Sequence, residues 1–422
     1  MTKVHTGRMV AGVVTMWVVC GTAAAADWPG FRGGEAAGVG QGSGYAAEWN
    51  RQSNVTWRTV LDGEGWSSPV AAGGRVYLTS AVQRGGRWML HALCLDAATG
   101  SILWNREVFS EDRALGTTRH EKNSRASATP VVEGDHLYVH FGNQGIACLT
   151  TGGEPVWSNR SLRYEPVHGN GGSPIVFGDR LILSCDGADE AFVVALDKAT
   201  GRQVWRTDRG VRTRSRFSFS TPLAIEVDDR TQVVSAGSGA VYGYDPTDGR
   251  VIWGVGYGEG YSVVPQPVYE QGLLYVCTGF NRASLLAIRP RGARGDVTQS
   301  ATAWSTNRAA PLTPTPVAAG GDVFMVSDQG VATCLDAKTG DVQWQQRIGG
   351  NYSASPVIAE GRVYFPSEDG EVVVVAASRE FRELARNSVG ERIFATPALV
   401  DGAIYLRTDA ALYRIGPVAS VN

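Results

Sequence analysis

Residues 315–344 read TPVAAGGDVFMVSDQGVATCLDAKTGDVQW, and this stretch contains the unit from which the chain is built. It opens with Thr-Pro-Val and passes through a glycine turn into a short apolar strand. It ends with an Asp-x-x-Thr-Gly turn that is followed four residues later by tryptophan. Apolar and polar residues alternate over four or five positions, which is typical of a half-buried β-strand and not of a helix. The stretch therefore predicts a small antiparallel sheet.

The opening motif recurs in eight copies, spaced 40 to 61 residues apart, with Gln replacing Ser or Thr in one of them. The copies begin at Ser68, Thr129, Ser173, Thr221, Gln266, Thr315, Ser355 and Thr396. Repeats of this length indicate an array of supersecondary units, each of which cannot bury its faces alone. The chain is therefore expected to fold as one ring or stack of sheets.

The closing motif pairs a tight turn with a tryptophan. Its clearest copies are Asp96–Gly100 with Trp104, Asp197–Gly201 with Trp205, Asp245–Gly249 with Trp253, and Asp336–Gly340 with Trp344. The aspartate accepts backbone hydrogen bonds at the start of the turn, and the glycine supplies a positive φ. The tryptophan returns on the next strand, where its ring can cover the neighbouring sheet. Trp157 and Trp304 hold the same place behind degraded turns, and Leu384 holds it in the seventh unit.

The count of units closes in one way. The eighth partner is Trp57, which precedes the first motif proline by 12 residues. We therefore expect the strand Val55–Arg58 to complete the last sheet, beside Tyr405 and Tyr413, and so to remove the exposed sheet edges. The predicted fold class is all-β, an eight-bladed β-propeller of four-stranded antiparallel sheets over residues 55–416.

One segment argues locally for a different structure. Residues 378–392 are rich in helix formers. The register of the repeats instead makes Phe381–Ala385 an outer strand. We follow the register, because eight consistent units outweigh a weak propensity.

The N-terminus has the pattern of an export signal. Lys3 and Arg8 precede an apolar run over residues 9–19, and three alanines at 24–26 form a small-residue cleavage pattern. We predict a signal peptide over residues 1–26, an N-terminal arm over 27–54 and a tail over 417–422. The mature protein is then expected outside the cytoplasm, in the periplasm or associated with the outer membrane. A lipid anchor on Cys20 stays open.

The turn motifs resemble the tryptophan-docking repeats of quinoprotein dehydrogenases. They also resemble the propeller lipoprotein, of BamB type, that accompanies outer-membrane β-barrel assembly, and the length suits this group better. The stretches 27–33 (DWPGFRG) and 120–127 (HEKNSRAS) resemble exported PQQ-like repeat proteins of planctomycete-type bacteria. The resemblance covers residues 27 to 416. It implies the propeller fold, and it implies an envelope or outer-membrane protein as partner. The fold alone does not determine the function, because function depends on specific sites.

The enzyme alternative is a dehydrogenase that depends on pyrroloquinoline quinone. That family resemblance would require a pair of adjacent cysteines and a calcium site of Glu, Asn and Asp, neither of which the sequence contains. We therefore expect no cofactor, no catalytic residues and no metal, and a protein-interaction or assembly scaffold rather than an enzyme. A quinone-dependent enzyme and a propeller that binds a small ligand or a saccharide remain the alternatives. Five cysteines follow the signal peptide, and they are expected to be small buried side chains and not disulfide partners.

Three further motifs have a stronger structural interpretation. Asp186–Glu190 is half of an acidic cation loop but fits a hairpin turn. Gly254–Gly260 resembles a phosphate loop, but no helix follows it. His136 and His140 lie on one face of a strand and favour packing over metal binding.

The distribution of charge is the most informative functional signal. The formal net charge is −2, which does not indicate a nucleic-acid partner. The loops within 105–128, 158–172 and 206–220, however, carry net charges of +1, +1 and +4. All three open on the same face of a propeller, and they predict a rim that binds an anionic or carboxylate-bearing partner. The candidate binding residues are His120, Lys122, Asn123, Arg125, His168, Arg209, Arg212, Arg214 and Arg216.

Two alternatives to this binding rim stay open. The arginines could pair with nearby acids, including those of the Asp186–Glu190 loop. Asn123 and Ser124 could satisfy backbone groups inside a long loop.

Overall fold

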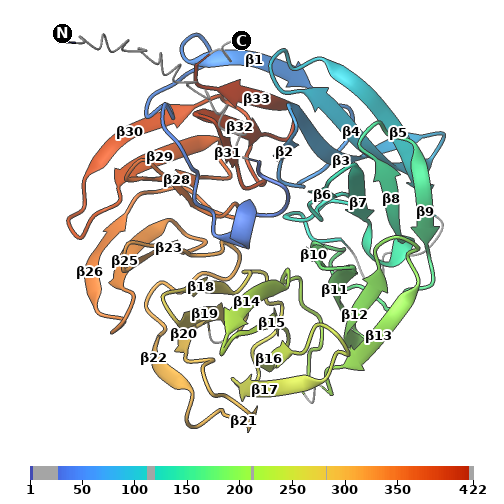
Figure 1. Cartoon of the computed structure of the whole chain (residues 1–422), viewed down its shortest axis with the longest axis vertical. Coiled ribbons are helices and arrows are strands. Elements are labelled where there is room, and N and C mark those ends of the chain that lie inside the picture. The colour runs from blue at the N-terminus through green and yellow to red at the C-terminus, as the bar shows by residue number, and fades with distance from the viewer. Residues whose placement is uncertain (3–26, 112–118, 211–212, 282, 418–422) are drawn as a thin grey trace.

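The computed structural model describes residues 1–2, 27–111, 119–210, 213–281 and 283–417. Residues 3–26 of the predicted signal peptide lie outside this range. Eight antiparallel sheets surround a central axis, and the chain passes around the ring once from β2 to β33 (Figure 1). The predicted eight-bladed all-β propeller is therefore confirmed.

In every blade but the last, the strands follow chain order from the innermost to the outermost. The first four blades are β2 (Val70–Ala72), β3 (Arg75–Arg84), β4 (Arg87–Asp96) and β5 (Ile102–Ser110); β6 (Val131–Glu133), β7 (His136–His140), β8 (Ile146–Thr150) and β9 (Pro155–Asn159); β10 (Ile175–Phe177), β11 (Arg180–Asp186), β12 (Ala191–Asp197) and β13 (Gln203–Asp208); and β14 (Leu223–Val227), β15 (Arg230–Ala236), β16 (Ala240–Tyr244) and β17 (Val251–Gly256).

The second half repeats this order. Its blades are β18 (Val268–Glu270), β19 (Leu273–Cys277), β20 (Leu285–Ile288) and β22 (Thr302–Thr306); β23 (Val317–Ala319), β24 (Asp322–Val326), β25 (Val331–Asp336) and β26 (Val342–Arg347); β27 (Val357–Ala359), β28 (Arg362–Pro366), β29 (Glu371–Ala376) and β30 (Glu383–Ser388); and β31 (Ala398–Val400), β32 (Ala403–Arg407), β33 (Ala411–Ile415) and β1 (Val55–Val60). Two short 3-10 helices complete the described elements, η1 (Gly34–Ala36) and η2 (Gly142–Gln144).

The last blade closes as predicted. Strand β1 pairs antiparallel with β33, and Arg58 lies opposite Tyr413. The ring of Trp57 lies 6.0 Å from the ring of Tyr405. Because the first strand completes the last sheet, the two ends of the ring are joined by backbone hydrogen bonds. The last blade therefore has four strands.

The tryptophans of the closing motif join consecutive blades. Six indole N–H groups donate to a backbone carbonyl in the turn of the next blade, over 2.8–3.2 Å. The pairs are Trp57 with Ala97, Trp104 with Thr151, Trp157 with Lys198, Trp205 with Pro246, Trp304 with Ala337 and Trp344 with Ser378. The turn glycine is required for this contact, because a Cβ on Gly201 would lie 2.4 Å from the Trp157 ring. Gly201 also has a φ of +70°, which disfavours other residues.

Two details differ from the sequence prediction. The outer strand of the seventh blade is a strand and not a helix, but it spans Glu383–Ser388 and not Phe381–Ala385. The preceding residues form a turn instead, in which the N–H of Ala376 donates to the carbonyl of Arg382. The fourth blade gains a short fifth strand, β21 (Gly295–Asp296), which pairs parallel with β17 beside Trp253. Trp253 accordingly donates within its own blade, to Oε1 of Gln232.

The N-terminal arm crosses the channel at the level of the innermost strands. Trp28 exchanges two backbone hydrogen bonds with Ala71 of β2, and the Pro29 carbonyl accepts from Val132 of β6. Further along the arm, Gly38 and Gly40 bond to Ile358 of β27, on the other side of the ring. Figure 1 shows this blue segment, with its short helix, at the centre of the ring. The arm therefore uses backbone groups that the inner strand edges would otherwise leave unpaired.

Arg32 is the most buried group of the arm, with no exposed surface. Its guanidinium donates to the carbonyls of Thr315, Pro316 and Pro356, at 3.4, 2.9 and 3.2 Å. It also reaches the carbonyls of Ala36 and Ala37 within the arm. Burial lowers the pKa of Arg32 to about 9, so the group is still protonated at neutral pH. The arm is thus fixed to the sixth and seventh blades by a buried cation that forms no ion pair with a carboxylate of the described residues.

The cysteines and the apolar segments complete the description of the core. All five cysteines of the described chain are buried and free, as expected. Cys94, Cys148 and Cys334 sit on the equivalent strands of three blades, opposite the docking tryptophans. No helix among the described residues has the length and apolar character to cross a bilayer.

Candidate functional site

The channel encloses a cavity of about 660 Å³ on the axis of the ring. Phe31 of the arm is one of its lining residues, so the arm borders the cavity. Away from the arm, it opens between the loops that join the outermost strand of one blade to the innermost strand of the next. Because the arm lies across the innermost strands, we call the arm side the sealed face and the loop side the open face. The volume lies in the range for small-molecule sites, about 300–1,000 Å³.

The first layer of the cavity wall is a ring of hydroxyl groups from the Ser/Thr-Pro motif. Ser68 N–H donates to Thr129 Oγ1 over 2.9 Å, and Thr129 N–H donates to Ser173 Oγ over 2.9 Å. The same link recurs between Ser173 and Thr221, Gln266 and Thr315, Thr315 and Ser355, and Ser355 and Thr396. The hydroxyl therefore joins adjacent inner strands, and proline can follow it because these strands form no further inner ladder.

The second layer consists of the residues two positions before the hydroxyl ring. They are Trp66, Ser127, Gly171, Phe219, Val264, Thr313, Ser353 and Phe394, one from each blade, and all eight line the cavity. In an extended segment, residues two apart point to the same side. The positions of this layer can therefore be found in the sequence, two residues before each of the eight copies of the opening motif.

Aromatic rings gather on two opposite sides of the cavity. Trp66 and Phe394 stack on each other at 4.7 Å, next to the first and last blades. Across the ring lie Phe217, Tyr261 and Phe280 of the fourth and fifth blades, linked at 5.4 and 6.1 Å. Phe280 is 49% exposed at the rim of the cavity. The apolar walls therefore face each other, and smaller or polar side chains fill the two gaps between them.

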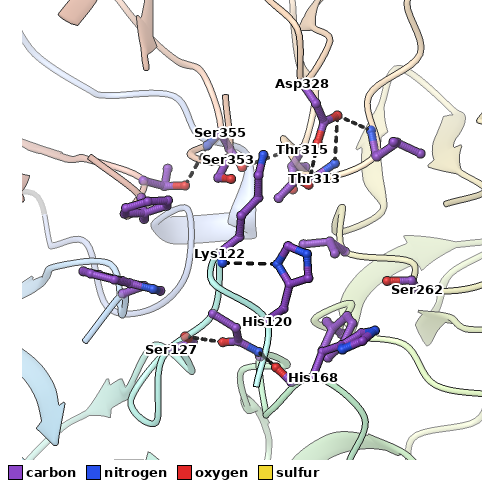
Figure 2. Close-up of a pocket in the computed structure, with 18 of the residues that line it drawn as sticks. His120, Lys122, Ser127, His168, Ser262, Thr313, Thr315, Asp328, Ser353 and Ser355 are labelled. Carbon is purple, nitrogen blue, oxygen red and sulfur yellow. Dashed lines mark hydrogen bonds between the residues drawn. The ribbon is translucent and has the colours of Figure 1, made fainter. Parts of the chain in front are cut away.

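Lys122 crosses the cavity from one gap to the other. Its Nζ lies 2.7 Å from Oε1 of Glu368, on the seventh blade, and Ser353 Oγ donates to the same oxygen over 2.6 Å. Figure 2 shows the Lys122 side chain extending toward Ser353. The N–H of Lys122 donates to Nδ1 of His120 over 3.2 Å. The His120 ring meets that of His168 edge-on at 5.6 Å.

The predicted residues Asn123 and Arg125 form contacts within their own loop and with neighbouring loops. Asn123 Nδ2 donates to the carbonyl of His168, and its Oδ1 accepts from Ser127 Oγ. Arg125 pairs with Glu111 at 2.7 Å and with Glu64 at 3.3 Å. The structure thus brings His120, Lys122, Asn123 and His168 to the cavity lining, whereas Arg125 lies in an ion-pair network beside it.

The predicted arginines of the 206–220 loop separate into three groups. Arg209 is buried and binds Asp186 through two hydrogen bonds of 2.6 and 3.1 Å. Burial alone would lower the pKa of Arg209, but the Asp186 carboxylate raises it. Arg214 and Arg216 are exposed on the open face. Arg212 lies outside the described residues.

Positive charge on the open face is therefore partly paired. Arg206 binds Glu190 and Asp208 there, whereas Arg106 binds Glu154 of the β8–β9 turn, toward the sealed face. Within the described part of the chain, the Arg216 side chain donates to the backbone carbonyl of Asp189. These contacts agree with the alternative in which the arginines of the charged loops form ion pairs with nearby acids.

The motifs with possible metal or phosphate chemistry take structural roles. Asp186 pairs with Arg209, and Asp189 caps the N–H groups of Glu165 and Glu190. His140 is buried, whereas His136 is exposed and stacks on Tyr138. Nowhere in the described ranges do three or more His, Cys, Asp or Glu side chains gather so that they could hold a metal ion.

The residues of the cavity do not fit a calcium-assisted quinone cofactor. Among the described lining residues Asp328 is the only acid. Its carboxylate accepts hydrogen bonds from the N–H of Leu312 at 2.7 Å and from the hydroxyl of Thr313 at 2.6 Å. The two apolar walls, which the sequence analysis missed, are the distinctive feature of the site instead.

Comparisons with known proteins agree with this architecture. A family model described as "Outer membrane protein assembly factor BamB" (PQQ_2) matches residues 15–114, 91–345 and 293–411. The chain is 24% identical over 206 residues to that factor from Yersinia pestis, which covers 44% of this chain and 49% of the relative. It is 26% identical over 204 residues to the one from Moranella endobia, covering 43% and 49%. The chain thus spans about half the length of the curated relatives it matches.

Two solved structures show the same fold at low identity. BamB from Moraxella catarrhalis superposes with a TM-score of 0.61 at 16% identity, over 87% of this chain and 98% of that chain. Quinohemoprotein alcohol dehydrogenase from Comamonas testosteroni superposes with a TM-score of 0.55 at 14% identity, over 92% and 80%. Since one relative is an assembly factor and the other a dehydrogenase, the fold by itself does not choose between binding and catalysis.

Proposed function

The chain belongs to the family of the outer membrane protein assembly factor BamB, and from this premise we propose that it is an exported, non-catalytic propeller that serves as an assembly scaffold for proteins of the cell envelope. The observation that carries the proposal is the family match, which extends around the whole ring from residue 15 to residue 411. The curated relatives that share sequence with it carry the same assembly-factor name. The planctomycete grouping and the export signal remain predictions.

The open face is the proposed partner surface. The sealed face is occupied by the chain's own arm, whose buried Trp28 and Arg32 bond to the first, sixth and seventh blades. The open face presents Phe280, which is 49% exposed, and the two exposed arginines Arg214 and Arg216. An exposed aromatic residue beside arginines is the composition found at the centre of protein–protein contacts.

Complementation in the source organism tests this proposal. Deleting the gene is expected to lower the amount of folded β-barrel proteins in the outer membrane, measured by heat-modifiable migration on gels. The wild-type gene should restore the amount, whereas a variant with Phe280→Glu, Arg214→Glu and Arg216→Glu should not. The matched control is Lys338→Glu, an equally exposed charge reversal in the turn between β25 and β26 on the sealed face. Unchanged outer-membrane proteins in the deletion strain would contradict the proposal.

The non-catalytic part of the proposal has its own test. Purified protein is mixed with pyrroloquinoline quinone and calcium, and the absorbance of the quinone is followed after gel filtration. We expect no stoichiometric uptake, because both carboxylate oxygens of Asp328 already accept hydrogen bonds from Leu312 and Thr313 of the loop that precedes β23. Tight uptake at one quinone per chain would instead support the dehydrogenase alternative.

A further inference from the structure

The cavity combines two features that lie outside any scaffold role. Its apolar walls are held opposite each other by the ring itself, since Trp66 and Phe394 come from the first and last blades and Phe217 and Tyr261 from the fourth and fifth. Between the walls the surface is polar. A ligand that fills this space must therefore have apolar faces and a polar perimeter.

The hydroxyl ring supplies hydrogen-bond donors to that perimeter. Six ring oxygens already accept a backbone N–H from the neighbouring blade. Each hydroxyl still has one proton to donate, and no acceptor for it is recorded within the described chain. The oxygens belong to Thr129, Ser173, Thr221, Thr315, Ser355 and Thr396. Because a hydroxyl carries one donor and two acceptor sites, this layer offers donors to a ligand rich in neutral oxygen atoms.

The charge of the cavity disfavours an anion. The charged groups of the lining and its immediate partner are one cation, Lys122, and two carboxylates, Asp328 and Glu368. Lys122 is held by Glu368 at 2.7 Å, so an anionic ligand would have to displace an existing ion pair. A neutral ligand can instead bind the same groups as hydrogen-bond partners without breaking the pair.

We infer that the cavity binds a neutral oligosaccharide of two or three pyranose rings. A pyranose ring has a C–H-rich face that packs on an aromatic ring and hydroxyl groups around its edge, which matches walls of Trp66, Phe394, Phe217 and Tyr261 around a polar centre. Phe280 extends the aromatic wall to the rim, so a chain longer than one ring continues to find a stacking partner. This inference goes beyond the proposed scaffold function and does not depend on it.

Isothermal titration of the purified full-length protein tests the inference. The probes are maltotriose, cellotriose and chitotriose, with trigalacturonic acid as an acidic comparator and the blocked peptide Ac-Tyr-Gln-Phe-NH2 as a polypeptide comparator. We expect at least one neutral trisaccharide to bind with a Kd of roughly 0.1–1 mM, and more tightly than either comparator. No neutral trisaccharide binding below about 10 mM, or binding of a comparator alone, would overturn the inference.

Variants assign any binding to the cavity. Trp66→Ala should weaken the trisaccharide at least about tenfold, which corresponds to the loss of one stacking contact. Phe280→Ala should weaken it by about threefold, and this variant keeps the test valid if Trp66→Ala does not fold, because Phe280 is 49% exposed. The matched control is Leu103→Ala, since Leu103 is 48% exposed on the outer strand β5 and should leave the affinity unchanged. Affinity that is equal in all three variants would place the sugar elsewhere and overturn the inference.

Discussion

At the sealed end of the channel a buried arginine is surrounded by backbone carbonyls, whereas at the open end aromatic rings and hydroxyl groups surround an accessible cavity. Arg32 makes bonds to three carbonyls across the ring and leaves no exposed surface. Phe280, at the other end, is half exposed, and its ring contacts the ring of Tyr261. At the sealed end, the polar groups are therefore used in hydrogen bonds that join the blades. At the open end, aromatic side chains remain available for contact with a ligand or a partner. This difference supports the proposal that the two faces of the ring serve stability and binding separately.

The largest expected effect comes from removing the buried cation of the sealed end. Arg32→Ala deletes several charged hydrogen bonds and leaves buried carbonyls without donors, which should lower the free energy of unfolding by about 3 kcal/mol. Urea denaturation followed by tryptophan fluorescence measures this loss. The matched control is Arg51→Ala, an arm residue whose side chain is 59% exposed.

The control should change stability by less than about 0.5 kcal/mol. If Arg32→Ala costs no more than Arg51→Ala, the arm does not hold the sealed end. The comparison between the two ends would then rest on the cavity alone.

The open end has a buried group of a different kind, which makes it sensitive to acid. His140 at the end of β7 is buried, and its Nδ1 bonds to the carbonyl of Gly172 at 3.1 Å. Burial lowers the pKa of His140 from 6.5 to about 4. The imidazole is therefore neutral in the fold, and below pH 6.5 the unfolded chain takes up a proton that the folded chain does not.

Stability should consequently fall as the pH drops from about 6.5 toward 4. At pH 5 the loss assigned to His140 is about 2 kcal/mol relative to pH 7.5, and His140→Asn should remove that part of the pH dependence. Urea denaturation at the two pH values measures it. His136→Gln on the same strand is the control, because His136 is exposed. A wild-type and a His140→Asn protein with the same pH dependence would show that the buried imidazole is not the acid-sensitive group.

Most of the ring could be predicted from the sequence, because the repeated motifs reflect the conformation of each turn and the packing of each tryptophan. Each Asp-x-x-Thr-Gly turn needs a positive φ at its glycine, and that glycine also leaves room for the tryptophan of the preceding blade, as at Gly201 against Trp157. Both residue types recur at fixed places in successive repeats, where the sequence displays them. Strand β21 was missed because its pairing with β17 joins an insertion to a blade that precedes it, and no local pattern marks such a contact.

The cavity was predicted only in part. His120, Lys122 and His168 were singled out by charge and type, and they do line it. The aromatic walls were overlooked, although Trp66, Phe219 and Phe394 each stand two residues before a ring hydroxyl. The pairing of Arg209 with Asp186 is the alternative that the sequence left open, but the sequence could not choose it over a binding role, because the pair joins two separate segments of the same blade. Counting the charges of a loop shows which charged side chains it contains. It does not show which of them already form ion pairs within the fold.

The hydroxyl ring lies between the two ends and should be the least sensitive of the three regions. Thr129→Val keeps the shape of the side chain but leaves the buried N–H of Ser68 without its acceptor at 2.9 Å. The expected loss of stability is about 1.5 kcal/mol, the cost of one unsatisfied buried donor. Thr129→Ser keeps the oxygen and should lose less than about 0.5 kcal/mol by the same urea measurement. Equal losses in the two variants would show that the methyl group matters and the hydroxyl does not. The Ser/Thr of the repeated motif would then be a packing residue, and the hydrogen-bonded link between blades would have to be assigned to the outer tryptophans alone.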